Sequence, residues 1–137
     1  MAVNPPVITG NYPDKEQAIH QFWSGFTWAA RDENTVPDNA MSLYSGHYIT
    51  YNVSTASLNE PVPLSASLWC KDTSWTEITA KAHEIAETLG RGGMLIKVQG
   101  GYVWIVRGTP FAQRMADDDD TIRRIYLNIM VEFLTEN

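Results

Sequence analysis

The clearest pattern in the chain is a long alternating segment from Thr121 to Leu134, in which every second residue from Ile125 to Phe133 is apolar. Such a period of two is typical of a β-strand with one buried face. The apolar positions are Ile125, Leu127, Ile129, Val131 and Phe133, and the other face carries Arg124, Tyr126, Asn128, Met130 and Glu132. We predict that the odd-numbered face belongs to the core. The even-numbered face is mixed and partly aromatic, and it is a candidate to pack against a neighbouring subunit.

Two other segments show the three- and four-residue spacing of an amphipathic helix. The first follows Asp14 and Gln17, which have the spacing of a capping box, and Gly25 leaves its end open between residues 26 and 30. The second is predicted to start with a capping box of Ser74 and Glu77 and to stop at Gly90. Their apolar stripes are Ala18, Ile19, Phe22, Trp23 and Phe26, and Ile78, Ala82, Ile85, Ala86 and Leu89.

Four shorter strands complete the predicted elements, at residues 47–54, 61–71, 94–99 and 102–107. Gly100-Gly101 predicts a hairpin between the last two. Because the order is helix, two strands, helix, three strands, without alternating βαβ units, we predict an α+β fold. It has an antiparallel or mixed sheet of about five strands, with two helices packed on one face. We expect one domain over 1–137, with an extended arm at 1–13 and polar loops at 31–46 and 108–120.

Composition and charge narrow the function classes. The 137 residues are 44% hydrophobic and 19% charged, as in ordinary globular domains, and no apolar run approaches the length of a membrane span. We expect an intracellular protein without membrane contact, since no signal peptide is evident. The formal net charge of −6 argues against specific nucleic-acid binding, which uses clustered basic residues.

Catalytic chemistry has few candidates. Cys70 is the single cysteine, and its place in an alternating strand predicts a buried thiol. His20, His47 and His83 are scattered, and no spacing pairs any of them with a nucleophile. The glycines match no phosphate-binding pattern. We therefore expect no enzyme activity and no cofactor; an enzyme would have to use Cys70 or the aspartates described next.

Four adjacent aspartates, Asp117, Asp118, Asp119 and Asp120, are the most conspicuous local feature. Adjacent carboxylates repel one another and need solvent, a cation or a basic partner. The main interpretation is a solvated loop. The alternatives are pairing with arginines of a neighbouring subunit, or a metal site for a hard cation such as Mg²⁺, although the run lacks the spacing of a calcium loop.

Aromatic and arginine side chains supply the candidates for a subunit interface. Trp69 lies on the strand face opposite Leu68 and Cys70, and Trp104 follows Tyr102 in register, so neither is predicted to face the core. Arginines surround the acidic run, and mixed charges of this kind suit contacts between identical subunits. The predicted interface residues are Trp69, Trp104, Arg107, Arg114, Asp118, Asp119, Arg123, Arg124 and Tyr126.

The order of elements and several stretches resemble a known family. Tyr48-Ile49-Thr50-Tyr51, the strand 64–72, the capped helix with Ile85 and Leu89, and the closing Arg-Ile-Tyr-Leu-Asn-Ile stretch look like the small tail-terminator or tail-completion proteins of lambda-like long-tailed phages and prophages. The resemblance covers roughly residues 44–134 and is one of layout. The short early helix, the Pro-rich start and the loop around Pro37 depart from it.

The resemblance implies a structural protein. Such a protein forms a ring, usually of six subunits, that caps the tail tube and joins it to the head connector. Its partners would be copies of itself, the tail tube protein and the head–tail connector, with DNA passing through the ring. It would be found in the bacterial host cytoplasm during assembly and then in the virion tail. The alternative is another head–tail adaptor, or a non-catalytic small-ligand-binding module.

Overall fold

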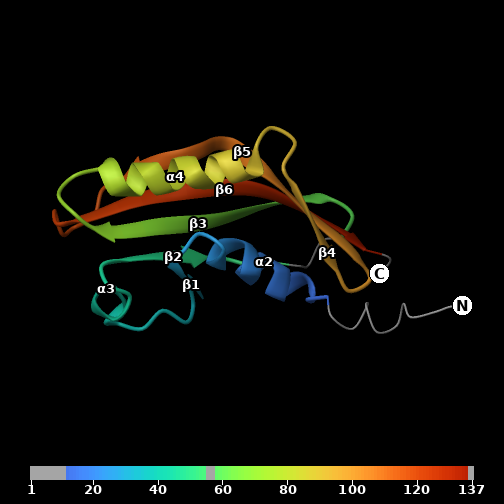
Figure 1. Ribbon diagram of the computed structural model, residues 1–137, viewed down its shortest axis with the longest axis horizontal. Coiled ribbons are helices and arrows are strands. Elements are labelled where there is room, and N and C mark those ends of the chain that lie inside the picture. Colours follow the sequence, from blue (N-terminus) through green and yellow to red (C-terminus); the bar gives the residue numbers. More distant parts are fainter. Residues whose placement is uncertain (1–11, 55–57, 136–137) are drawn as a thin grey trace, which may run out of the picture.

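The computed structural model describes residues 12–54 and 58–135, and over these ranges the chain forms three helices and six strands (Figure 1). The predicted arm at 1–13 therefore lies almost entirely outside the described residues. In chain order the elements are α2 (Lys15–Ser24), β1 (Ala29–Asp32), α3 (Ala40–Leu43), β2 (His47–Tyr51), β3 (Pro61–Lys71), α4 (Thr76–Leu89), β4 (Met94–Val98), β5 (Gly101–Met115) and β6 (Ile122–Thr135).

All six strands belong to one mixed sheet with the order β1-β2-β3-β6-β5-β4. β1 pairs in parallel with β2, and every other neighbouring pair is antiparallel. The long strand β3 pairs with β6 over its whole length, from Pro61 opposite Glu132 to Lys71 opposite Ile122. The predicted α+β class with a mixed sheet is confirmed, with one strand and one helix more than expected in the described ranges.

The helices occupy different places along the sheet. Helix α4 contacts the central strands β3, β6 and β5, whereas α2 contacts β1 and β4, which lie at opposite edges (Figure 1). A flat sheet could not bring both edges to one ten-residue helix, so the sheet curls around its helical side. The single-turn helix α3 contacts β2. The prediction of two helices on one face is therefore incomplete, because α2 bridges the sheet edges and α3 was not expected.

The core lies between the curled sheet and the helices. The odd-numbered face of β6 is fully buried, as its alternation predicted, and the predicted inward direction of Cys70 is confirmed by an exposed fraction of 2%. In α2, Asp14 accepts a hydrogen bond from the Gln17 amide and the Gln17 side chain accepts one from the Asp14 amide, which confirms the capping box. The stripe Ala18, Ile19, Phe22 and Trp23 is buried in the same core.

The predicted loop at 31–46 contains regular structure. β1 ends at Asp32 within it, and α3 fills Ala40–Leu43. The segment Ala29–Asp32 has no alternation to reveal a strand; it is held by its parallel pairing with β2, in which buried Ala30 lies opposite Ile49. The structure of β1 therefore depends on its pairing with β2, which the local sequence does not reveal.

The predicted loop at 108–120 is mostly strand. β5 continues to Met115, and only 116–121 connect it to β6. Arg107 lies opposite Ile129 but Ala112 lies opposite Leu127, so β5 carries extra residues between them as a bulge. Residue 108 is a glycine in this bulge, where a larger side chain would clash: a Cβ there would lie 2.9 Å from the Asn128 carbonyl oxygen. The Asn128 side chain then donates a 2.9 Å hydrogen bond to the Pro110 carbonyl.

The start of α4 also differs from its prediction. Trp75 is the N-cap residue, and no side chain caps the helix. Instead, the Asp72 carboxylate accepts from the Ser74 amide at 2.9 Å, and the Ser74 hydroxyl accepts from the Thr76 amide at 3.1 Å. The Ser74 hydroxyl therefore accepts from the Thr76 amide, whereas a Ser74–Glu77 capping box would require it to accept from the Glu77 amide. The Gly90 stop and the Gly100 turn are confirmed, both with positive φ.

Candidate subunit interface

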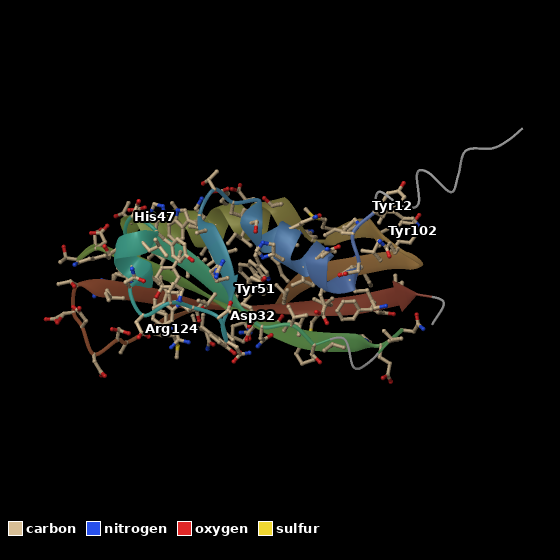
Figure 2. The ribbon with its side chains drawn as sticks, turned by 90° about the horizontal axis from the view of Figure 1, so that it is seen from below. Tyr12, Asp32, His47, Tyr51, Tyr102 and Arg124 are labelled. Atoms are coloured by element: carbon tan, nitrogen blue, oxygen red, sulfur yellow. The ribbon has the colours of Figure 1, made fainter. Side chains whose placement is uncertain are left out.

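The sheet face opposite α2 and α4, which we call the open face, gathers several of the predicted interface residues. It carries the even-numbered positions of β6, and these are half-buried where the odd-numbered ones are fully buried. Two groups of aromatic residues lie on it. Arg124 marks one group and Tyr102 the other, and Figure 2 shows them toward opposite ends of the molecule.

The first group is an arginine–aromatic ladder made of Tyr48, Trp69, Arg124 and Tyr126. The Tyr48 and Trp69 rings stack with centroids 6.0 Å apart and planes at 13°. The Arg124 guanidinium lies 4.7 Å from the Trp69 ring centroid and 6.0 Å from that of Tyr126. The structure thus brings together three predicted residues, Trp69, Arg124 and Tyr126, from two paired strands.

Hydrogen bonds fix the ladder in place. Arg124 donates to the Ser67 hydroxyl from Nε at 3.2 Å and from Nη2 at 3.0 Å, and the Trp69 indole donates to the Thr50 hydroxyl at 2.9 Å. Among the described residues, no carboxylate lies within ion-pair distance of Arg124. The ladder is therefore a preorganised surface whose cation has capacity for an acidic partner group.

A polar groove of about 440 Å³ runs beside the ladder. It is lined by the ladder, by Thr50, Ser65 and Ser67 on the strands, by Asn52 just after β2, and by Glu33 and Val36 of the loop after β1. Burial raises the pKa of the Tyr48 phenol, and the nearby Asp117 carboxylate raises it further. The acidic loop therefore lies close enough to this end of the open face to influence it electrostatically.

The second group, the Trp104 patch, consists of Leu95, Tyr102 and Trp104 at the β4–β5 hairpin. These side chains remain 57%, 42% and 40% exposed, which is unusual for large apolar groups. Leu95 and Trp104 are direct cross-strand partners, and the Trp104 indole donates to the Gly92 carbonyl at 2.9 Å. This hydrogen bond fixes the orientation of the exposed Trp104 ring, as is common for aromatic residues that anchor an interface.

The other three predicted arginines lie elsewhere. Arg114 and Arg123 stack on Trp75, with guanidinium carbons 4.6 Å and 5.2 Å from the ring centroid. Arg123 also donates to the Thr73 carbonyl at 2.7 Å. Their register partners, Ile125 and Cys70, are core-facing, so this stack belongs to the helical side and not to the ladder. Arg107 is exposed at the start of the β5 bulge.

The aspartate run forms the exposed turn between β5 and β6. Asp119 accepts hydrogen bonds from the Thr121 amide and hydroxyl at 2.8 Å and 2.6 Å, and these bonds lower the pKa of its carboxyl. Asp117 accepts from the Asp119 amide at 3.1 Å. The two ion pairs found within 12–54 and 58–135 involve neither these aspartates nor Asp118 and Asp120. The aspartates are exposed within the described part of the chain, and their pairing with a neighbouring subunit or a cation stays a prediction.

The candidate nucleophile is not activated. Burial raises the pKa of the Cys70 thiol to about 12, and the Glu77 and Asp72 carboxylates add to the shift. No hydrogen bond within the described residues joins Cys70 to a histidine: His20 contacts the Tyr51 hydroxyl at 2.7 Å and Ser24 at 3.2 Å, and His47 contacts Glu77 at 3.2 Å. Cys70 is thus a protonated core thiol at neutral pH.

The sequence did not single out Tyr48, Ser67 and Leu95 as interface candidates. Each lies beside a predicted residue only through cross-strand pairing: Tyr48 opposite Trp69, Ser67 opposite Tyr126, and Leu95 opposite Trp104. A usable signal was available for Tyr48, because it alternates out of phase with the buried Ile49 and Tyr51 in its own strand.

A search of solved structures finds the same fold in a chain of the virion of a native gene transfer agent particle. The TM-score is 0.54 with 17% sequence identity, and the match covers 86% of this chain and 92% of that one. At this identity the likeness establishes a common fold. No family model matches the sequence, and no curated protein matches it either. Among the described residues, no helix has the length and apolar character needed to cross a membrane.

Proposed function

We propose that this protein is a non-catalytic structural component of a phage or phage-like virion, and that it acts as a tail terminator. In this role it forms a ring that caps the tail tube and joins it to the head connector. The likeness to a virion chain over 86% of the sequence supports the virion setting. The layout resemblance described above supports the terminator role.

The observation that carries the ring is the pair of unlike surfaces on the open face. Trp104 lies opposite Glu132 on β6, eight residues from Arg124, so the patch and the ladder are about 26 Å apart along the strand. A closed ring needs head-to-tail contacts, in which one surface of a subunit meets a different surface of the next. An exposed apolar patch at one end and an arginine–aromatic surface at the other meet that requirement.

Mass measurement with electron microscopy tests this proposal. The wild-type protein is expected to form one closed oligomer, visible as a ring. Trp104→Glu is expected to shift it to monomers, because it places a charge in an apolar contact. His83→Glu is the matched control, since His83 is exposed on the helical side. A wild-type protein that stays monomeric at all concentrations, with and without Mg²⁺, would refute the ring.

Tail tubes assembled from the same phage's tube protein separate terminators from other adaptors. A terminator is expected to bind at one end of the tube and to stop its growth. Binding to the head connector without binding to the tube would favour the alternative of a different head–tail adaptor.

The polar groove beside the ladder is the observation that favours the second alternative, a small-ligand-binding module. Its volume of about 440 Å³ is within the range of ligand sites, although its lining is more polar than is usual for them. A monomeric protein whose tryptophan fluorescence responds to a small-molecule library, and whose Ser67→Leu variant does not, would support this alternative over the ring.

A further inference from the structure

We propose that Cys70, Asp72, Glu77 and His47 form a binding site for a transition-metal ion of the zinc class. The site lies where the start of β2, the end of β3 and the first turn of α4 meet. It is separate from the ladder and the Trp104 patch, and it does not depend on the proposed function.

The first observation is the convergence of three ligand atoms of suitable type. The Cys70 sulfur and one carboxylate oxygen each of Asp72 and Glu77 all lie within 4.8 Å of one another. A point between atoms so spaced lies within roughly 2.8 Å of all three, whereas zinc bonds measure about 2.0–2.3 Å. Rotamer adjustments of less than about an ångström would therefore close the site.

The second observation is a histidine at the border of this cluster, which contacts Glu77 but is not among the three side chains whose ligand atoms converge. His47 Nδ1 lies 3.2 Å from the Glu77 Oε2 oxygen. His47 is the cross-strand partner of Cys70, so both side chains leave the same face of the sheet. Its ring stacks on Trp28 with centroids 4.5 Å apart and planes at 11°, which fixes the direction of its nitrogen atoms. In metal sites a ligating histidine is usually also held in orientation by a neighbouring group of the protein.

The chemistry of the donors selects the ion. One sulfur, one imidazole nitrogen and two carboxylate oxygens form a mixed set that suits Zn²⁺ and Co²⁺, while Mg²⁺ and Ca²⁺ prefer all-oxygen sites. The buried thiol is the ligand that distinguishes this cluster from an ordinary acidic surface. The exposed aspartate run, which offers oxygen only, lacks it.

Local hydrogen bonds and the start of α4 position the Asp72 and Glu77 carboxylates. Asp72 uses one oxygen to accept the Ser74 amide, and its own amide donates to the Thr121 carbonyl at 2.8 Å, so its backbone is fixed. Glu77 stands in the first turn of α4 with its side chain 51% exposed, which leaves a path from solvent to the site. A bound ion would join two strands and a helix that are separate in sequence and would stabilise the folded state.

Titration of the untagged, chelator-treated protein with Co²⁺ and Zn²⁺ tests the proposal. We expect one equivalent of Co²⁺ to produce a thiolate-to-cobalt charge-transfer band, which Zn²⁺ abolishes by displacement, and a rise in Tm with either ion. Glu77→Gln is expected to weaken the affinity at least about tenfold. Cys70→Ser is expected to remove the charge-transfer band.

The double variant Asp118→Asn with Asp120→Asn is the matched control, because it removes two exposed carboxylates outside the site and should leave binding unchanged. Should Cys70→Ser fail to fold, the band in the wild type and its loss on Zn²⁺ addition still decide the matter. Absence of the band at stoichiometric Co²⁺, or binding that the acidic-run control abolishes, would overturn the site.

Discussion

The Lys81 ammonium nitrogen lies 2.6 Å from the carbonyl oxygen of Phe26. Lys81 is only 9% exposed, and it also pairs with Glu84 at 2.8 Å and lies 5.4 Å from the Trp28 ring centroid. It therefore ties α4 to the turn that follows α2. That turn includes Thr27, whose φ of 67° is uncommon outside glycine.

Lys81→Met should lower the free energy of unfolding by about 1–3 kcal/mol, because the Phe26 carbonyl loses its charged donor and keeps only the Thr27 hydroxyl. Urea unfolding measures the loss. Lys97→Met is the matched control: Lys97 is half-buried and lies 4.6 Å from the centroid of the exposed Tyr102 ring, and its loss should cost well under 1 kcal/mol. Equal losses in the two variants would contradict the assigned role of Lys81.

Gly93→Ala should be far more damaging than Gly100→Ala. Both glycines have φ near +80°, so both variants incur the left-handed penalty of about 1–2 kcal/mol. At Gly93 a Cβ would also lie 2.4 Å from the Ile105 carbonyl oxygen, whereas nothing lies within 4 Å at Gly100. The β4–β5 pairing would then have to shift. Thermal unfolding of the two variants measures the difference, and similar Tm values would contradict the close approach.

Cys70 should make the protein less stable at high pH. The folded-state pKa of its thiol is about 12 against an ordinary value of 9.0, so between these values the unfolded chain loses the proton and the folded chain keeps it. The thiol's contribution is complete below about pH 9 and is lost as the pH rises toward 12. With chelator present, the stability difference between the wild type and Cys70→Ala should shrink over that window. A constant difference would contradict the raised pKa.

Asp118→Asn combined with Asp119→Asn should leave the monomer folded, since these side chains are exposed. If the acidic run contacts an arginine of a neighbouring subunit, the double variant should also weaken assembly and reduce its dependence on salt. Sedimentation at two ionic strengths measures both effects. Unchanged assembly and an unchanged Mg²⁺ response would remove both the contact and the cation hypotheses for this loop.

The elements with strong periodicity could be predicted from the sequence. The alternation from Ile125 to Phe133 predicted the buried face of β6, and the Asp14–Gln17 spacing predicted the start of α2. In both, local pattern and tertiary packing impose the same arrangement. β1 has only four residues and no pattern, and its pairing with β2 gives it a structure that its own residues do not specify.

The residues of the candidate sites also fall into those that the sequence could predict and those that it could not. Trp69, Arg124 and Tyr126 could be selected because each departs from the core face of a recognisable strand. The grouping of His47 with Cys70 could not, since it depends on the register of β2 against β3. Glu77 joins them because α4 begins beside the end of β3, a relationship set by the turns at Asp72 and Ser74.

The bulge in β5 bears on how copies of this protein can associate. β4 pairs with β5 only as far as Ile105, so within the described residues no strand covers the outer edge of β5 from Val106 to Met115. A long bare edge would let sheets join without limit, as fibrils do. The extra residues between Arg107 and Ala112, with Pro110 lacking an amide donor, break that edge into short pieces. Growth by strand addition is thereby discouraged, and association through side chains, which can saturate at a fixed number of copies, is favoured.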